Sequence, residues 1–218
     1  MQSRTSRIIQ TAEFRASVVG ASVPASPSGA NEITRSVQSV PRPTRQSSPS
    51  VAISNKAISQ SLSKTILAVD SSLRGTGYAI LRHENGKTRV LAYDVIKNHP
   101  KISQEACLVA IHDTLAACIT KFSPEEFAIE SAIFVQSYET AIVLGTASGV
   151  AILAAARAGL PVHRYAPRRV KQAVVGRGGA QKQQVSFMVR VMLGLTETPP
   201  PDAADAIAVG ITHLQTRM

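Results

Sequence analysis

Four acidic residues stand where the chain is expected to pass from one structural element to the next. Asp70 and Glu130 each end a short apolar run that predicts a buried strand. Asp202 and Asp205 follow three prolines, and their spacing of three residues places both on one face of a helix. A carboxylate beside a buried strand costs free energy unless a positive group or a metal ion lies opposite it. We therefore take these four residues as candidates for chemistry.

Carboxylates gathered in one place predict a particular kind of metal site. If the strands that end at Asp70 and Glu130 are neighbours in a sheet, their side chains meet at its edge, and the helix can bring its pair of acids to them. Oxygen-only ligands favour Mg²⁺, with Mn²⁺ as an alternative, over zinc. Two such ions about 4 Å apart would activate a water and stabilise the leaving oxygen in phosphodiester hydrolysis. Taken singly, Asp70 and Asp202 could instead cap a turn and a helix, and Glu130 could lie on the surface.

The charge of the chain points to a polyanionic partner. Its formal net charge is +10, and no acidic residue occurs between Glu139 and Glu197. A block of one sign inside a folded domain indicates a phosphate-facing surface, since solvated faces normally mix signs. The basic residues of this block are Arg157, Arg164, Arg168, Arg169, Lys171, Arg177, Lys182 and Arg190.

The composition divides the chain into two parts. Residues 1–60 are rich in Ser, Thr, Pro and Arg and are expected to be a disordered extension. An organellar transit peptide is a minor alternative, and a start codon assigned too far upstream is a simpler one. Residues 61–218 are expected to form one soluble globular domain, because no apolar run is long enough to span a bilayer. Cys107 and Cys118 are expected to be buried free thiols. The five histidines show no metal-ligand spacing and are expected to be surface or core residues.

Within the globular part, periodicity predicts a mixed sheet flanked by helices. The expected strands are 66–70, 78–82, 89–96, 127–130 and 161–165, and the expected helices are 103–121, 140–158, 167–175, 181–193 and 202–213. Ser103 is a plausible cap for the first helix. The many small residues of the second predict close packing against another element or a second subunit.

Several segments together resemble the RuvC family of bacterial crossover junction endodeoxyribonucleases. They are the strand and turn containing Asp70, Thr76 and Gly77, the segment IESAIF, the helix LGTASGVAILAAA, the run YAPRRVKQAVVGRGGAQKQQV and the segment PDAADAIAVGITH. The resemblance covers about residues 64–216. It implies a ribonuclease H-like α/β fold and Mg²⁺-dependent paired nicking of four-way DNA junctions in recombination and repair. It further implies a cytoplasmic homodimer that works beside a branch-migration motor.

The resemblance also assigns roles to individual residues. Asp70, Glu130, Asp202 and Asp205 would be the metal-binding catalytic acids. Lys171 and Lys182 match residues that contact DNA near the cleaved phosphate, and Arg168, Arg169 and Arg177 belong to the same basic surface. An aromatic residue after the glutamate wedges into the junction in this family, and here Phe134 takes that place, shifted by one position.

Two features depart from the family pattern, and two other functions remain open. Family members commonly show Asp-Pro-Gly where this chain has Asp70, Ser71 and Ser72, and the 60-residue extension lies outside the pattern. The turn also resembles the phosphate-gripping turn of actin-like and hexokinase-like ATPases, although those proteins are far longer. A non-catalytic, basic junction-binding protein, in which the acids are purely structural, is the other alternative.

Overall fold

The computed structural model describes residues 63–131 and 137–217, whose five strands form one mixed sheet in the order β3-β2-β1-β4-β5. β1, β2 and β3 pair antiparallel, whereas β1, β4 and β5 run parallel. The predicted mixed five-stranded sheet is thus confirmed, and so is the pairing of the strands that end at Asp70 and Glu130. The strands are β1 (Lys64–Asp70), β2 (Gly75–Glu84), β3 (Lys87–Lys97), β4 (Glu126–Glu130) and β5 (Val162–Tyr165).

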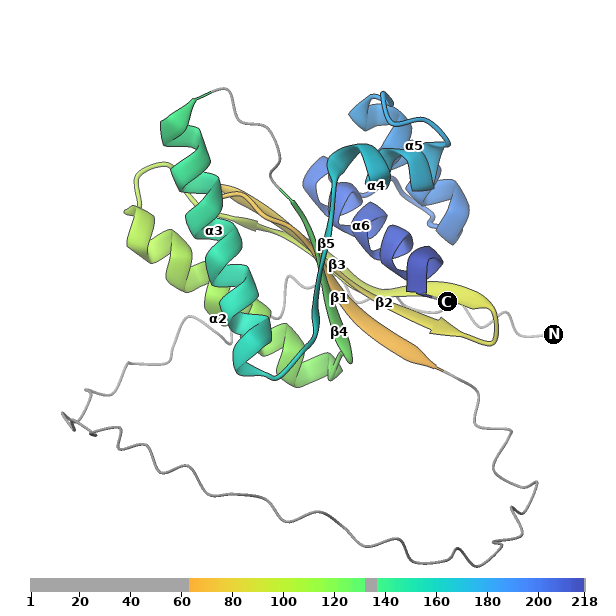
Figure 1. Cartoon of the computed structure of the whole chain (residues 1–218), viewed down its shortest axis with the longest axis horizontal. Helices are drawn as coiled ribbons and strands as arrows, with labels where there is room; N and C mark the ends of the chain where they lie inside the picture. The colour runs from red at the N-terminus through yellow and green to blue at the C-terminus, as the bar shows by residue number, and fades with distance from the viewer. Residues whose placement is uncertain (1–62, 132–136, 218) are drawn as a thin grey trace, which may run out of the picture. The chain divides into compact units, whose positions relative to one another are not determined.

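Helices cover both faces of this sheet (Figure 1). On one face lie α2 (Gln104–Phe122) and α3 (Tyr138–Arg157). The other face carries α6 (Pro201–Arg217), with α4 (Pro167–Val175) and α5 (Lys182–Leu193) packed on it. Each predicted helix is present, with ends that differ from the expected ones by at most four residues.

The alternation of side chains along β1 divides the interior into two cores. Ile66 and Ala68 pack with α4, α5 and α6, whereas Leu67 and Val69 pack with α2 and α3. All four side chains are completely buried, as expected for a central strand covered on both faces. Successive residues of a strand face opposite sides, so Asp70 continues the row of Ile66 and Ala68 and faces α6.

Helix α6 is buried on nearly all sides. Every residue from Ala206 to Leu214 is buried, and the small side chains let the helix lie very close to the sheet. A Cβ added to Gly210 would lie 2.5 Å from Leu81 Cδ1 and 3.1 Å from Ala68 Cβ. The position of α6 relative to β1 and β2 is therefore fixed by direct contact.

On the opposite face, α2 and α3 pack together through small residues. Ser103 caps α2 by accepting a hydrogen bond from Ala106 N, as predicted, and Cys107 and Cys118 are free and completely buried. The alanine face of α3 is buried in the same core. Among the described helices, α3 is also the one that is long and apolar enough to cross a membrane by length and composition, a property that the sequence reasoning did not anticipate.

The start of β2 differs from the prediction. The strand was expected to begin at residue 78, after a turn containing Gly77, but β2 begins at Gly75. Gly75 and Gly77 both pair with β3, and Gly77 also pairs with Asp70 of β1. The lack of a side chain suits these positions because the first turn of α6 lies directly against them. The extension over residues 1–60 and the wedge residue Phe134 lie outside the described residues, so those two predictions remain untested.

Candidate active site

Three of the four predicted acids converge where β1 ends and α6 begins. One carboxylate oxygen from each of Asp70, Asp202 and Asp205 lies within 4.8 Å of the others. Asp202 does not cap the helix, since α6 begins at Pro201 and Ala204 N donates a hydrogen bond to Pro200 O. The spacing of three residues brings both aspartates of α6 to the same point, as predicted.

Glu130 reaches the same site from β4. It lines one cavity of about 950 Å³ together with the three aspartates, although its carboxylate lies outside the cluster that spans 4.8 Å. The parallel pairing of β1 with β4 places the carboxyl ends of both strands at one edge of the sheet. All four predicted acids therefore share one cavity.

Hydroxyl groups hold the turn that follows Asp70, where the family pattern has proline and glycine. Ser72 Oγ accepts a hydrogen bond from Gly75 N at 3.0 Å, and Thr76 Oγ1 donates one to Ser72 O. The hydroxyls of Ser71 and Ser148 are 2.6 Å apart, which ties the turn to helix α3. Side-chain hydrogen bonds of this kind stabilise tight turns without a proline, so the departure in sequence leaves a well-connected turn.

Two glycines let the β1–β2 turn and the start of α6 touch. A Cβ on Gly75 would lie 2.9 Å from Asp202 Oδ2, and one on Gly77 would lie 1.9 Å from Asp202 O. The second contact is to backbone, which cannot rotate away. Asp202 can therefore occupy its position only if residue 77 has no side chain.

Burial and neighbouring carboxylates raise the pKa values of Asp70 and Glu130. Burial, together with the neighbouring Asp205 and Asp202 carboxylates, raises the pKa of Asp70 from its ordinary 3.8 to about 6. Burial and the Asp70 and Asp205 carboxylates raise the pKa of Glu130 from 4.5 to about 7. Groups with such shifts are typical of functional sites, and a cation would relieve the repulsion between them.

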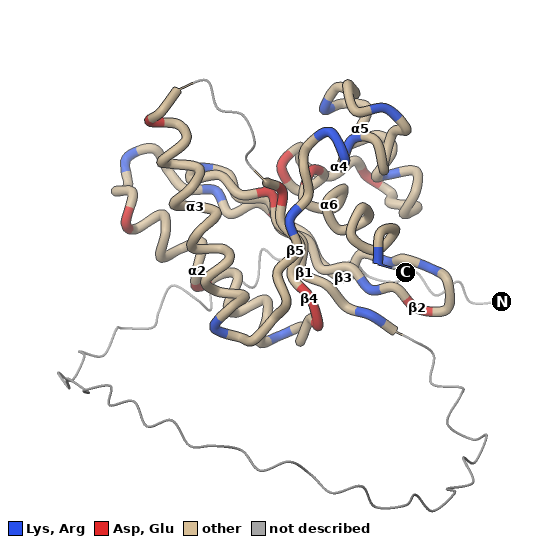
Figure 2. Tube along the Cα trace, in the orientation of Figure 1, with Lys and Arg blue, Asp and Glu red and all other residues tan. Residues whose placement is uncertain are grey.

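Basic residues form another part of the cavity wall. Figure 2 shows Lys and Arg positions in blue on α4 and α5. Lys182 Nζ lies 3.0 Å from Asp205 Oδ2, and this hydrogen bond raises the pKa of the lysine. Arg168 and Lys171 of α4 line the cavity as well. Arg169 and Arg177 are exposed and do not belong to the lining residues, so three of the five predicted basic residues line the cavity of the acids.

The raised pKa values predict that the metal-free protein loses stability as the pH rises. An acid whose pKa is higher in the folded state contributes full stability below its ordinary pKa, and this contribution is lost as the pH rises through the folded value. For Asp70 that window runs from about pH 4 to about 6, and its shift of about two units corresponds to at most about 3 kcal/mol. In EDTA, Asp70→Asn should therefore stabilise the protein more at pH 8 than at pH 4, as measured by urea unfolding.

The comparison between the two pH values separates ionisation from packing. A packing effect of the asparagine is independent of pH and cancels in the difference between the two measurements. Equal changes in unfolding free energy at pH 4 and pH 8 would show that Asp70 is not under electrostatic strain.

The structure also brings together residues that the sequence reasoning kept apart. His163 of β5 and His213 of α6 were expected to be unrelated, but both contact Glu126 at the start of β4. The alternation of side chains along β4 could have indicated that Glu126 faces α6. Glu126 and Glu130 are four residues apart, so they share the face of β4 that α6 covers. The pairing of β4 with β5 brings His163 close, which only the sheet order could reveal.

Comparison with known proteins identifies the family. Residues 66–213 match the family described as "Crossover junction endodeoxyribonuclease RuvC". The chain belongs to the RuvC family. The RuvC of Akkermansia muciniphila is 49% identical over 149 residues, which cover 68% of this chain and 89% of the relative. The RuvC of Marinobacter nauticus is 45% identical over 148 residues, covering 68% and 84%.

Solved structures agree with the RuvC assignment. Thermus thermophilus RuvC in complex with a Holliday junction substrate is 35% identical, with a TM-score of 0.65, and the match covers 69% of this chain and 93% of that one. This likeness confirms the ribonuclease H-like resolvase fold. Membership in the RuvC family confirms the predicted activity, a Mg²⁺-dependent endodeoxyribonuclease that resolves crossover junctions. It decides against the ATPase and the non-catalytic alternatives.

Proposed function

We propose that this RuvC-family nuclease cuts four-way DNA junctions with two Mg²⁺ ions held by Asp70, Glu130, Asp202 and Asp205. The observation that supports this most directly is the convergence of three carboxylates within 4.8 Å, with the fourth in the same cavity. This donor set fits the metal, because Mg²⁺ prefers carboxylate oxygens and the described residues that line the cavity include no histidine or cysteine. When bound, the ions would supply an activated water and positive charge at the leaving oxygen.

The residues of the chain then have separate tasks. Asp70 and Glu130, fixed at the ends of paired strands, give the site a rigid side. Asp202 and Asp205 complete it from α6, whose position is fixed by contact with the sheet. Lys182, whose ammonium group contacts Asp205, would hold the phosphate at the cut. Lys171 and Arg168 extend this phosphate-binding wall along α4.

We further propose that junction DNA lies across α4 and α5. Thermus thermophilus RuvC is solved in complex with a Holliday junction substrate, and the acid-free block of this chain includes both helices. Such contacts are made mainly to phosphates, so they provide affinity rather than sequence preference. Arg169 and Arg177, exposed outside the catalytic cavity, would contact more distant phosphates.

A homodimer would supply the two active sites that paired nicking requires. Helix α3 presents exposed apolar side chains, with Tyr138 81%, Ile142 49% and Leu153 50% exposed. Together with the exposed Gly145 and Gly149, they form a face suited to close packing with a second copy. The RuvC relatives from Akkermansia muciniphila and Marinobacter nauticus support a bacterial cytoplasmic nuclease. The family match over residues 66–213 supports residues 1–60 as an extension outside the nuclease domain. A branch-migration motor would work beside this nuclease.

The proposed function is tested by nicking of a synthetic four-way junction with the full chain. We expect symmetric nicks in Mg²⁺, no nicks in EDTA, and little cutting of a linear duplex of the same sequences. Mg²⁺-independent nicking would contradict the role of the acids. Equal cutting of junction and duplex would contradict structure selectivity.

The two lysines of the cavity wall should affect both binding and cleavage. Lys171→Gln and Lys182→Gln should each lower the slope of log affinity against log salt by about 1, the contribution of one phosphate contact. Cleavage at saturating DNA should fall as well, because both side chains lie in the cavity of the acids. Fluorescence anisotropy at several salt concentrations and a single-turnover nicking assay measure the two effects.

Lys87→Gln provides the matched control. Lys87 is an exposed lysine at the turn between β2 and β3 and does not line the cavity. Its substitution removes the same charge from the chain. If Lys87→Gln lowered the salt dependence of binding as much as Lys171→Gln and Lys182→Gln, the net charge of the chain would explain binding, and specific phosphate contacts would not.

A further inference from the structure

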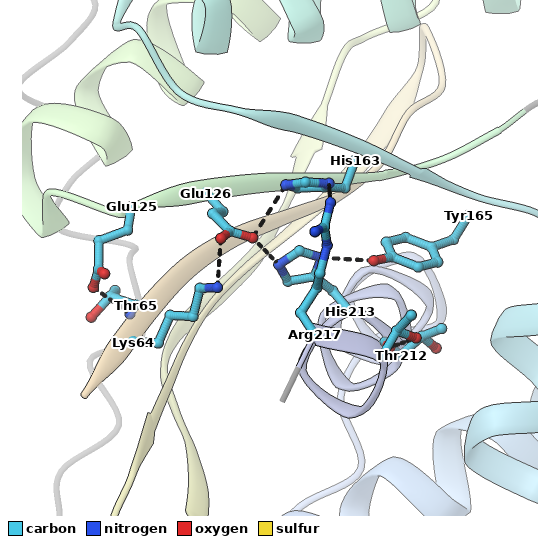
Figure 3. Close-up of polar contacts among 10 residues, drawn as sticks. Lys64, Thr65, Glu125, Glu126, His163, Tyr165, Thr212, His213 and Arg217 are labelled. Carbon is cyan, nitrogen blue, oxygen red and sulfur yellow. Dashed lines mark hydrogen bonds and ion pairs between the residues drawn. The ribbon is translucent and has the colours of Figure 1, made fainter. Parts of the chain in front are cut away.

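Glu126, His163 and His213 form a second cluster of side chains that could bind a metal (Figure 3). Asp202 and Asp205 lie in the first turns of α6, whereas His213 lies near its C-terminal end. Glu126 opens β4, and Glu130 lies four residues further on, about 13 Å along the strand. Glu126 Oε2 lies 3.2 Å from Nε2 of His163 and 2.6 Å from Nε2 of His213. The three side chains thus converge on one point from β4, β5 and α6.

The side chains at this point are largely buried and contact one another. His213 is completely buried, and the side chains of His163 and Glu126 are only 17% and 19% exposed. Glu126 Oε2 forms ion pairs with His163 Nε2 and His213 Nε2, and among the described residues these three atoms make no further hydrogen bond. A metal ion bound by all three atoms would replace these ion pairs.

We propose that Glu126, His163 and His213 form a Zn²⁺ site, separate from the proposed Mg²⁺ site and independent of nuclease activity. Two imidazole nitrogens and one carboxylate oxygen are a donor set typical of zinc, and unlike the acids at the other end of α6 they do not suit Mg²⁺. Ligand atoms around tetrahedral zinc are roughly 3.3 Å apart. The distance from Glu126 Oε2 to His163 Nε2 already matches this value. The distance from Glu126 Oε2 to His213 Nε2 would have to increase by less than 1 Å.

Neighbouring side chains are placed to orient two of these ligands. Tyr165 Oη lies 2.8 Å from Nδ1 of His213, and Lys64 Nζ lies 2.5 Å from Glu126 Oε1. A tyrosine hydroxyl can accept as well as donate, so it can hold His213 with the proton on Nδ1 and leave Nε2 free for the metal. Such outer partners fix ligand orientation in most zinc sites.

Arg217 opposes metal binding in the described arrangement. Its guanidinium lies 2.9 Å from Nδ1 of His163, and because a guanidinium only donates, Nδ1 accepts and the proton stays on Nε2. Zinc binding therefore requires that this proton moves to Nδ1 and that Arg217 withdraws. Arg217 is exposed near the end of α6, so it can turn into solvent.

Zinc at this site would link the end of α6 to two neighbouring strands. The same helix carries Asp202 and Asp205 in its first turns, so the ion would stabilise the element that completes the proposed active site. The expected effect is therefore on thermal stability, which can be measured apart from cleavage.

The test is a calorimetric titration of the untagged full chain with ZnCl₂ in excess Mg²⁺, which keeps the acidic site occupied. We expect one Zn²⁺ per chain and a higher unfolding temperature. His163→Gln should abolish this binding, and Tyr165→Phe should weaken it by about 10–100-fold. Arg217→Gln should tighten it. His112→Gln, which removes a histidine beside Asp113 on α2, should bind like the wild type.

Two results would overturn the proposal. One is the absence of Zn²⁺ uptake by the wild type, and the other is unchanged binding by His163→Gln. Since a histidine variant could fail to fold, the Co²⁺ complex of the wild-type chain provides a second measurement. A tetrahedral visible spectrum is expected, and an octahedral spectrum, typical of oxygen ligands, would contradict the assignment.

Discussion

Asp70→Asn is expected to lower the rate of junction cleavage by about a thousand-fold or more while leaving junction binding intact. Asp70 lies at the centre of the acid cluster, within 4.8 Å of Asp202 and Asp205. Loss of one metal-binding carboxylate should remove about 4 kcal/mol or more of transition-state stabilisation, which corresponds to this factor. Single-turnover nicking of a four-way junction in Mg²⁺ measures the rate, and a gel-shift assay in Ca²⁺ measures binding.

Binding should be retained or become tighter, since the substitution removes a negative charge from a surface that faces phosphates. Asp113→Asn is the matched control, because Asp113 is exposed on α2 and contacts only His112 among the described side chains. It should cleave at the wild-type rate. Cleavage by Asp70→Asn within tenfold of the wild type would show that the acid cluster is not the catalytic centre.

Gly77→Ala is expected to destabilise the protein by about 2–3 kcal/mol and to remove most of its nuclease activity. The added methyl group would lie 1.9 Å from the backbone oxygen of Asp202, so β2 and α6 must separate. Overpacking of this kind typically costs about 1–3 kcal/mol. The separation would also carry Asp202 and Asp205 away from Asp70, so activity should fall even where the variant remains folded. Urea unfolding and the nicking assay measure the two effects.

Gly179→Ala provides the control for stability. A Cβ at Gly179 would meet nothing within 4 Å, so its unfolding free energy should change by less than about 0.5 kcal/mol. If Gly77→Ala were as stable and active as the wild type, close contact between β2 and α6 would not be needed to position the acids.

The acid site could be predicted because local patterns point to it. Apolar runs that end on Asp70 and Glu130 predict strands, and the three-residue spacing of Asp202 and Asp205 predicts a shared helix face. The remaining condition was that the two strands pair, which the sheet confirms. The turn at Gly75 and Gly77 was predicted less well, because glycine is typical of turns and its use against α6 depends on tertiary contact.

The hydroxyl contacts and the histidine cluster could not be predicted in the same way. Ser71 and Ser148 are 77 residues apart and meet only because α3 packs beside the turn. His163 and His213 are 50 residues apart and show no ligand spacing, so no local pattern connects them with Glu126. Both features depend on the order of the strands and on the position of α6, which only the complete fold determines.

The route of the chain through the acid site also has a consequence for folding kinetics. Glu130 follows Asp70 by about 60 residues, and Asp202 follows Glu130 by about 70 residues. The site therefore forms only after two long loops close. Contacts between distant residues usually form late, whereas helices such as α2 can form early. During refolding, recovery of nuclease activity should therefore lag behind recovery of helical signal, and a partly folded chain would be unable to nick DNA.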